Sequence, residues 1–130
     1  MPRRPATTFA AVRSIGRTLP GVGESTMYGA PALKLRGKML ACMASHKSAE
    51  PNTLVVRLDF EDRDALIADD PRTYYLKPHY EGYPSVLVRL SLIDREALRD
   101  LLHSAWRIVM ASAPKRRPRQ SPGGRRKSPS

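Results

Sequence analysis

The chain has 130 residues and a formal net charge of +11, from 23 lysines and arginines against 12 acidic residues. Its length predicts one domain, and none of its apolar runs approaches the roughly 20 residues that a membrane helix needs. Residues 113–130 hold seven of the cations and no acid. Because this segment is nearly all Lys, Arg, Pro, Gly and Ser, it cannot bury a core. We predict a disordered basic tail behind a domain of residues 1–112.

The N-terminus and the single cysteine both suggest a compartment. No long apolar segment follows the first arginines, which argues against a secretory signal. The only cysteine, Cys42, excludes an internal disulfide and suits a reducing compartment. It stands in an apolar run, where a lone cysteine is typically a core residue rather than a nucleophile. We therefore expect a cytoplasmic protein.

The first half of the chain reads as a helix followed by two hairpins. A helix is predicted over Thr8–Arg17, because Thr7 can cap it and apolar residues recur at helical spacing. Leu19-Pro20 ends that helix. The corner at Gly29–Pro31 separates two strands, and proline there indicates a bulge or an edge. Arg36–Lys38 is predicted to be a hairpin tip with a positive φ at its glycine.

The middle of the chain predicts two further strands and a short helix. Met39–Ala44 is almost wholly apolar, as in a strand that is buried on both faces. Thr53–Phe60 alternates, which places Phe60 on the inward side of a strand. Asp59 is expected to cap a helix over Glu61–Ala68, whose acids occupy the first turn.

The last third contains two strands around an aromatic loop, and then a helix. Thr73–Leu76 is a short β-prone run, Lys77–Pro84 is the loop, and Ser85–Leu90 is a strand. Asp94 is a plausible cap for an amphipathic helix that ends near Ala111. The order α-β-β-β-α-β-β-α predicts an α+β sandwich, in which an antiparallel sheet carries its helices on one face.

The residues that most often carry catalysis form no recognisable pattern. The histidines, His46, His79 and His103, are too far apart for a zinc-type spacing. No phosphate loop or nucleophile elbow is present. An unrecognised active site around His79, Tyr80 and Glu81 is the remaining alternative. We predict no enzyme activity, no cofactor and no metal.

Binding has more support, because the sheet face opposite the helices is predicted to be basic. The expected alternation places Lys34, Arg36, Arg57 and Arg89 on it. The tyrosines, which could border this stripe, are Tyr28, Tyr74, Tyr75, Tyr80 and Tyr83. Cations that neutralise phosphates and rings that stack on bases suit a nucleic-acid surface. The alternative is an ordinary solvated face with tyrosines in the core or at its rim, since a one-residue slip would invert the face.

The tail offers a second cationic element. Its cations form two clusters separated by proline and glycine, namely Lys115, Arg116 and Arg117, and then Arg125, Arg126 and Lys127. Such a segment binds polyanions without sequence preference, or serves only solubility. Its contribution to nucleic-acid binding should depend strongly on salt.

Four segments together resemble the MmcQ/YjbR family. They are Leu19-Pro-Gly-Val22, the run from Tyr28 to Ala41, Gly82-Tyr83 before a strand, and Ala105-Trp106 late in the last helix. The resemblance extends over about residues 9–115. It implies a frataxin-like (CyaY-like) fold in a small cytoplasmic protein, and DNA binding through a double-wing arrangement of hairpins.

The chain departs from that family at two places, and the family supplies no catalytic residues. The strand after the hairpin tip often has an aromatic residue, where this chain has Met39 or Leu40. The loop glycine is often followed by tryptophan, here Tyr83. Frataxin-type iron chemistry needs an acidic ridge, which this sequence lacks.

The leading hypothesis is therefore a non-enzymatic DNA-binding protein without sequence preference. Its phosphate contacts would come from Lys34, Arg36, Lys38, Arg57 and Arg89, together with the tail. The second hypothesis is a protein- or small-ligand-binding module that uses Lys77–Pro84, in which His79, Tyr80 and Tyr83 contact the ligand. A monomer is expected.

Overall fold

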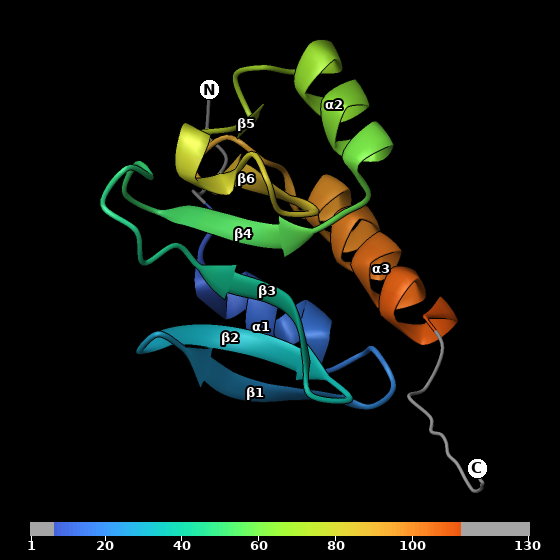
Figure 1. The fold of residues 1–130 in the computed structure, drawn as a ribbon. Helices are drawn as coiled ribbons and strands as arrows, with labels where there is room; N and C mark the ends of the chain where they lie inside the picture. The colour runs from blue at the N-terminus through green and yellow to red at the C-terminus, as the bar shows by residue number, and fades with distance from the viewer. Residues whose placement is uncertain (1–6, 113–130) are drawn as a thin grey trace, which may run out of the picture.

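The computed structural model describes residues 7–112. Residues 1–6 and 113–130 lie outside the described part, and with them every basic residue of the predicted tail. The elements are α1 (Phe9–Gly16), β1 (Val22–Met27), β2 (Ala30–Leu35), β3 (Lys38–Met43), β4 (Thr53–Arg57), α2 (Phe60–Asp69), β5 (Tyr74–Tyr75), the 3₁₀ turn η1 (Pro78–Tyr80), β6 (Ser85–Arg89) and α3 (Arg95–Ala111) (Figure 1).

The strands form one six-stranded antiparallel sheet in the order β1-β2-β3-β4-β6-β5. Four strands precede α2, so the predicted order with three was wrong. The strand that this order left out of the count is β1, the mostly polar strand that precedes the corner at Gly29–Pro31. It nevertheless pairs with β2 along all six of its residues, because a tight turn at Tyr28-Gly29 folds it straight back.

The helices cover one face of this sheet and enclose the main core (Figure 1). Leu33, Val56 and Val88 point from the sheet toward Leu98 and Leu102 of α3, and all five are buried. The predicted amphipathic helix is confirmed, since its apolar stripe is inside and Asp94 accepts a 2.7 Å hydrogen bond from the Ala97 amide. The α+β architecture with helices on one face follows from this packing.

Both hairpin turns have the backbone that two-residue β-turns require. Tyr28 and Gly29 have φ of 53° and 80°, and Arg36 and Gly37 have 55° and 78°. Positive φ at both central residues is the signature of a type I′ turn, whose twist matches the flanking strands. The predicted hairpin tip at Arg36–Lys38 is thus confirmed.

The sheet irregularity lies elsewhere than predicted. Pro31 is opposite Thr26 and precedes the β2–β3 ladder, so its missing N–H costs that ladder nothing. The register instead shifts beside Leu33, where Leu40 is the extra residue of β3. As a result Leu40 and its neighbour Ala41 both pack into the helix-side core.

Three local predictions at helix starts were wrong or incomplete. Thr7 does not cap α1; its hydroxyl donates to the Ile93 carbonyl at 2.8 Å, and Thr8 holds the cap position without a side-chain hydrogen bond. Asp59 is the cap residue of α2, also without such a bond. Phe60 begins α2 rather than ending β4, and its ring is 46% exposed.

Candidate functional site

The sheet face away from the helices is more apolar than the sequence predicted. A second buried cluster lies there, formed by Ala32, Cys42, Val55, Tyr75, Tyr80 and Leu87. It exists because β3, β4 and β6 carry apolar residues at consecutive positions, so that both faces of the central strands are buried. We call this the second face.

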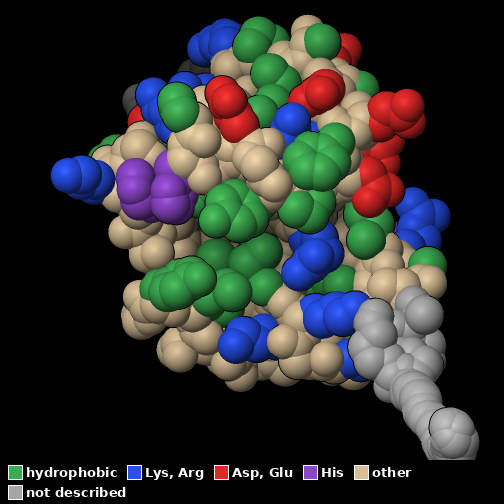
Figure 2. Space-filling model, in the orientation of Figure 1, with side chains coloured by type: hydrophobic (Ala, Val, Ile, Leu, Met, Phe, Trp, Pro, Cys, Tyr) green, Lys and Arg blue, Asp and Glu red, His purple; other side chains and the backbone are tan. Residues whose placement is uncertain are grey.

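A groove with a volume of about 650 Å³ opens on the second face. Figure 2 shows it as a green hollow bordered by purple histidine on one side and by blue cations on another. Two of its rings stand far into solvent, since Tyr28 is 85% exposed and Tyr83 57% exposed. The groove is lined by Met27, Tyr28, Met39, Cys42, Ala44, Ser45, His46, Val55, Arg57, His79, Tyr80, Tyr83, Pro84 and Ser85.

Two histidines that are remote in sequence stack at the edge of this groove. The rings of His46 and His79 are 3.6 Å apart and nearly parallel at 9°, and Tyr80 meets both edge-on. The Ser48 amide donates to His46 Nδ1 at 3.1 Å, so that nitrogen carries no proton. Desolvation, His79 and Lys47 together lower the pKa of His46. Near neutral pH the His46 imidazole is therefore uncharged, and its ring forms a flat aromatic surface at the edge of the groove.

The third histidine lies elsewhere. His103 stacks on Trp106 of α3 at 5.7 Å. Within residues 7–112, no group of three or more His, Cys, Asp or Glu side chains is arranged to hold a metal ion. The His46–His79 pair thus presents an aromatic surface at the edge of the groove.

Arg57 is the one Lys or Arg side chain among the residues that line the groove. Its Nε donates to the Met39 carbonyl at 2.7 Å, which fixes the guanidinium against β3. No other hydrogen bond or ion pair reaches Arg57 from the described residues, so its two terminal nitrogens have no protein partner there. They are available to an anion in the groove.

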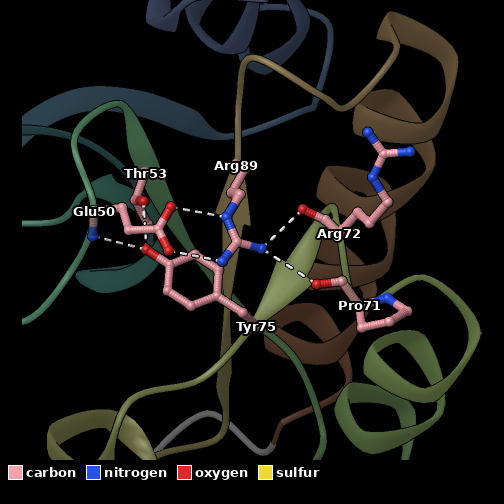
Figure 3. A network of polar contacts seen from close by, with 6 residues as sticks. All are labelled: Glu50, Thr53, Pro71, Arg72, Tyr75 and Arg89. Carbon is pink, nitrogen blue, oxygen red and sulfur yellow. Dashed lines mark hydrogen bonds and ion pairs between the residues drawn. The ribbon is translucent and has the colours of Figure 1, made fainter.

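Arg89, predicted to contact phosphates, is engaged by the protein itself (Figure 3). Its Nε and Nη2 donate to the two carboxylate oxygens of Glu50 at 2.8 and 2.7 Å. Its Nη1 donates to the carbonyls of Pro71 and Arg72. The Glu50 hydrogen bond raises the pKa of Arg89, and the same bond lowers the pKa of Glu50. This arginine is therefore structural.

Tyr75 completes that network beneath Arg89. The guanidinium carbon lies 4.1 Å from the ring centre, and the phenol oxygen is 2.6 Å from Thr53 Oγ1. The Glu50 amide donates to the same phenol oxygen at 2.9 Å. Tyr75 and the neighbouring Tyr74 are buried, so neither borders the groove as predicted.

The remaining predicted cations lie around the β2–β3 turn. Lys34 is on the second face, opposite Gly23 and Met39, and Arg36 is an exposed turn residue. Lys38 begins β3, and its Nζ donates to Ser112 Oγ at 3.1 Å. Ser112 follows α3 and is the last described residue, so the C-terminal end of α3 lies beside this hairpin. The six predicted tail residues, Lys115, Arg116, Arg117, Arg125, Arg126 and Lys127, lie outside the described part.

Cys42 is a core residue, as predicted. Its side chain belongs to the second buried cluster, and burial raises its pKa from 9.0 to about 11, with a smaller opposing effect from Lys34. The thiol is thus protonated at neutral pH and poorly suited to be a nucleophile.

Sequence reasoning placed His79, Tyr80 and Tyr83 in one loop but missed the groove that they border. Met27, Met39 and His46 reach it from other segments. The apolar runs on both faces of β3 and β4 were the one available signal, because a strand buried on both sides implies cover on the second face. Which residues cover the second face depends on the path of the loops across it, which the sequence pattern does not show.

Comparison with known proteins places the chain in a family. The family model described as YjbR matches residues 17–108, which include both hairpins, the groove and most of α3. The chain belongs to the YjbR family. Three uncharacterized mycobacterial proteins, one from Mycobacterium bovis and two from strains of Mycobacterium tuberculosis, are 49% identical to it over 51 residues. That match covers 39% of this chain and 37% of each relative's length.

A solved structure shows the same fold as this YjbR-family chain. A Deinococcus radiodurans protein described by a DUF419 domain superposes with a TM-score of 0.68. The two sequences are 21% identical, and the match covers 85% of this chain and 83% of the other. Among residues 7–112 of the chain, no helix is long and apolar enough to cross a membrane.

Proposed function

We propose that this YjbR-family protein is a cytoplasmic, non-enzymatic DNA-binding protein with a frataxin-like (CyaY-like) domain. The β1–β2 and β2–β3 hairpins would be its two wings, and residues 113–130 a non-specific basic arm. The observation that carries this proposal is the hydrogen bond between Lys38 and Ser112. It places Ser112, the residue that precedes the basic segment in sequence, beside the basic turn. On this proposal the two cationic elements act on one phosphate backbone.

The charges around the β2–β3 turn support a polyanion surface. Lys34 and Arg36 enter no ion pair with the described residues, whereas Arg13 and Arg17 share an ion pair with the single carboxylate of Glu24. Figure 2 shows cations below the groove with no acid among them, whereas the visible acids lie above and to one side of it, where other cations also lie. Segregation of this kind produces a positive field that attracts phosphate over several ångströms.

The geometry favours backbone contacts over base reading. The β2–β3 turn is a tight two-residue connection, and Arg36 at its tip is exposed. The outer side of α3 carries both acidic and basic side chains, which does not suit insertion into a groove of DNA. Binding should therefore be weakly sequence-dependent and strongly salt-dependent.

The test is a salt-dependent titration of the full chain with a short DNA duplex. A Lys34→Ala/Arg36→Ala variant should weaken binding and make the slope of log Kobs against log salt shallower by about two. A second variant has the seven lysines and arginines of residues 113–130 replaced by serine. It should retain residual binding that depends on Lys34 and Arg36.

A matched control removes the same charge elsewhere. Arg72 and Arg99 have exposed side chains outside the hairpins, and the Arg72 side chain points away from the network in Figure 3. Arg72→Ala/Arg99→Ala should change the slope far less than the hairpin variant does. If the two double variants weaken binding equally, DNA binding depends on net charge and not on the hairpin. If the tail variant loses all binding, the folded domain does not contact DNA.

A further inference from the structure

We propose that the second-face groove binds a small aromatic monocarboxylate. In this arrangement the carboxylate pairs with the terminal nitrogens of Arg57, and the aromatic body lies against the rings and methionines of the groove. The inference is independent of DNA binding, because the groove uses none of the cations at the β2–β3 turn.

The size and lining of the groove suit a small organic molecule. Its volume of about 650 Å³ lies within the roughly 300–1,000 Å³ that ligand sites occupy. Met27, Met39 and Val55 contribute apolar surface from three strands. Methionine side chains adapt to the shape of a ligand and make favourable contacts with aromatic rings. An apolar hollow of this kind gains free energy when a ligand displaces water from it.

Charge complementarity indicates a monoanion. Among the lining residues Arg57 is the single Lys or Arg, and no Asp or Glu is present. A guanidinium on partly apolar surroundings is stabilised by an anion, and its planar fork matches the two oxygens of a carboxylate. A dianion such as a phosphate monoester would leave one charge uncompensated in the groove.

Arg57 differs from Arg89 in having no carboxylate partner among the described residues. Both arginines lie on the second face, on the adjacent strands β4 and β6, and each donates Nε to an oxygen at 2.7 or 2.8 Å. For Arg89 that oxygen belongs to Glu50, which then binds a second nitrogen. For Arg57 it is a backbone carbonyl, and the remaining nitrogens are left for a ligand. Because the carbonyl already orients the guanidinium, little ordering is needed on binding.

The rings at the rim favour an aromatic body over an aliphatic chain. Tyr28 and Tyr83 are strongly exposed, although large rings usually gain from burial. The ring of His79 packs on His46 and lies 6.3 Å from that of Tyr83. A flat ligand can stack between or against such rings, and each ring pair adds to the simple burial of apolar area.

The experiment is calorimetric titration of the full chain with 2-naphthoate and with the neutral 2-naphthamide. We expect 2-naphthoate to bind more tightly, and Arg57→Gln to weaken it about tenfold or more, to the level of the amide. Tyr83→Ala should weaken both compounds, because it removes exposed ring surface and leaves the guanidinium in place. Arg99→Gln is the matched charge control and should change neither affinity.

Further outcomes and competition titrations test whether the groove binds a different class of ligand. Equal affinity for naphthoate and naphthamide, or an Arg57→Gln variant that folds and binds naphthoate normally, would overturn the proposal. Tighter competition by decanoate would replace the aromatic class with an aliphatic one. Tighter competition by a thymidine trinucleotide would assign the groove to nucleic acid. Lys34→Ala/Arg36→Ala should leave naphthoate binding unchanged, so failure of the DNA proposal and failure of this one are separable. Circular dichroism of each variant checks that it is folded.

Discussion

Arg89 and Glu50 join β6 to the loop after β3 through two parallel hydrogen bonds, Nε to Oε1 at 2.8 Å and Nη2 to Oε2 at 2.7 Å. The ion pair engages Arg89, a cation that the sequence analysis predicted to contact a ligand just as it did Arg57. Arg57, on the neighbouring strand β4, forms no ion pair with any carboxylate of residues 7–112. The placement of one acidic residue thus separates a structural arginine from a candidate binding arginine.

Removal of the Tyr75 hydroxyl should destabilise the fold without affecting the groove. Tyr75→Phe deletes the hydrogen bonds to Thr53 and to the Glu50 amide in a ring that is 7% exposed. Because these partners would be left unsatisfied, the free energy of unfolding should fall by about 1–3 kcal/mol. Chemical denaturation measures this, and Tyr83→Phe, at an exposed ring, should be close to neutral. Equal stability of the two variants would contradict the network.

The Glu50–Arg89 pair should make stability depend on acidic pH. The hydrogen bond from Arg89 lowers the pKa of Glu50 below its ordinary value of 4.5. Its contribution is therefore complete above about pH 4.5 and is lost as the pH falls through the lowered value. We expect the difference in unfolding free energy between the natural chain and Glu50→Gln to be largest near neutral pH and to shrink in acid. A difference that stays constant with pH would contradict this.

The histidine stack should produce a separate pH dependence at milder acidity. Desolvation, His79 and Lys47 lower the pKa of His46 from its ordinary 6.5, so the folded chain binds fewer protons than the unfolded chain just below that pH. Stability is then full above pH 6.5 and falls as the pH drops toward the lowered value. Thermal melts between neutral pH and pH 5 should show a shallower decline for His46→Gln than for the natural chain. An equal decline for His46→Gln and the natural chain would contradict this expectation.

The thiol of Cys42 should react slowly with alkylating reagents. Burial raises its pKa from 9.0 to about 11, which reduces the thiolate fraction at neutral pH about one hundredfold. As the chain has one cysteine, the labelling rate with iodoacetamide reports this site alone. Labelling should accelerate sharply in denaturant. A rate in the native chain equal to that of a free thiol would contradict the burial.

Local sequence patterns were sufficient to predict those elements whose conformation is set by neighbouring residues. The 3.6-residue periodicity and the Asp94 cap predicted α3, and glycine placement predicted the tip of the β2–β3 hairpin. Phe60 was misplaced because an apolar residue after an alternating strand also suits the first turn of a helix. The helix begins at Phe60, directly after the cap residue Asp59, and the Phe60 ring is partly exposed with the Arg63 guanidinium lying over it.

The candidate site was predictable only in part. The loop with His79 and Tyr83 was recognised from its composition, and Arg57 was placed on the correct face by strand alternation. That face was expected to be basic, since alternation says nothing of what a returning loop will cover. His46 and Met27 enter the groove from segments whose positions depend on the entire sheet.

The sequence by itself determined the family, the order of most elements and the inward positions of β2, β4 and β6, because these follow from residue periodicity and turn chemistry over short distances. Only the tertiary structure decided which of the predicted binding cations are already engaged by the protein itself. Arg89 meets a carboxylate 39 residues away, Arg57 meets a carbonyl 18 residues away, and Lys38 meets the end of α3. Such pairings are set by sheet register and loop return, and a charge acquires its role only when its neighbours in space are fixed.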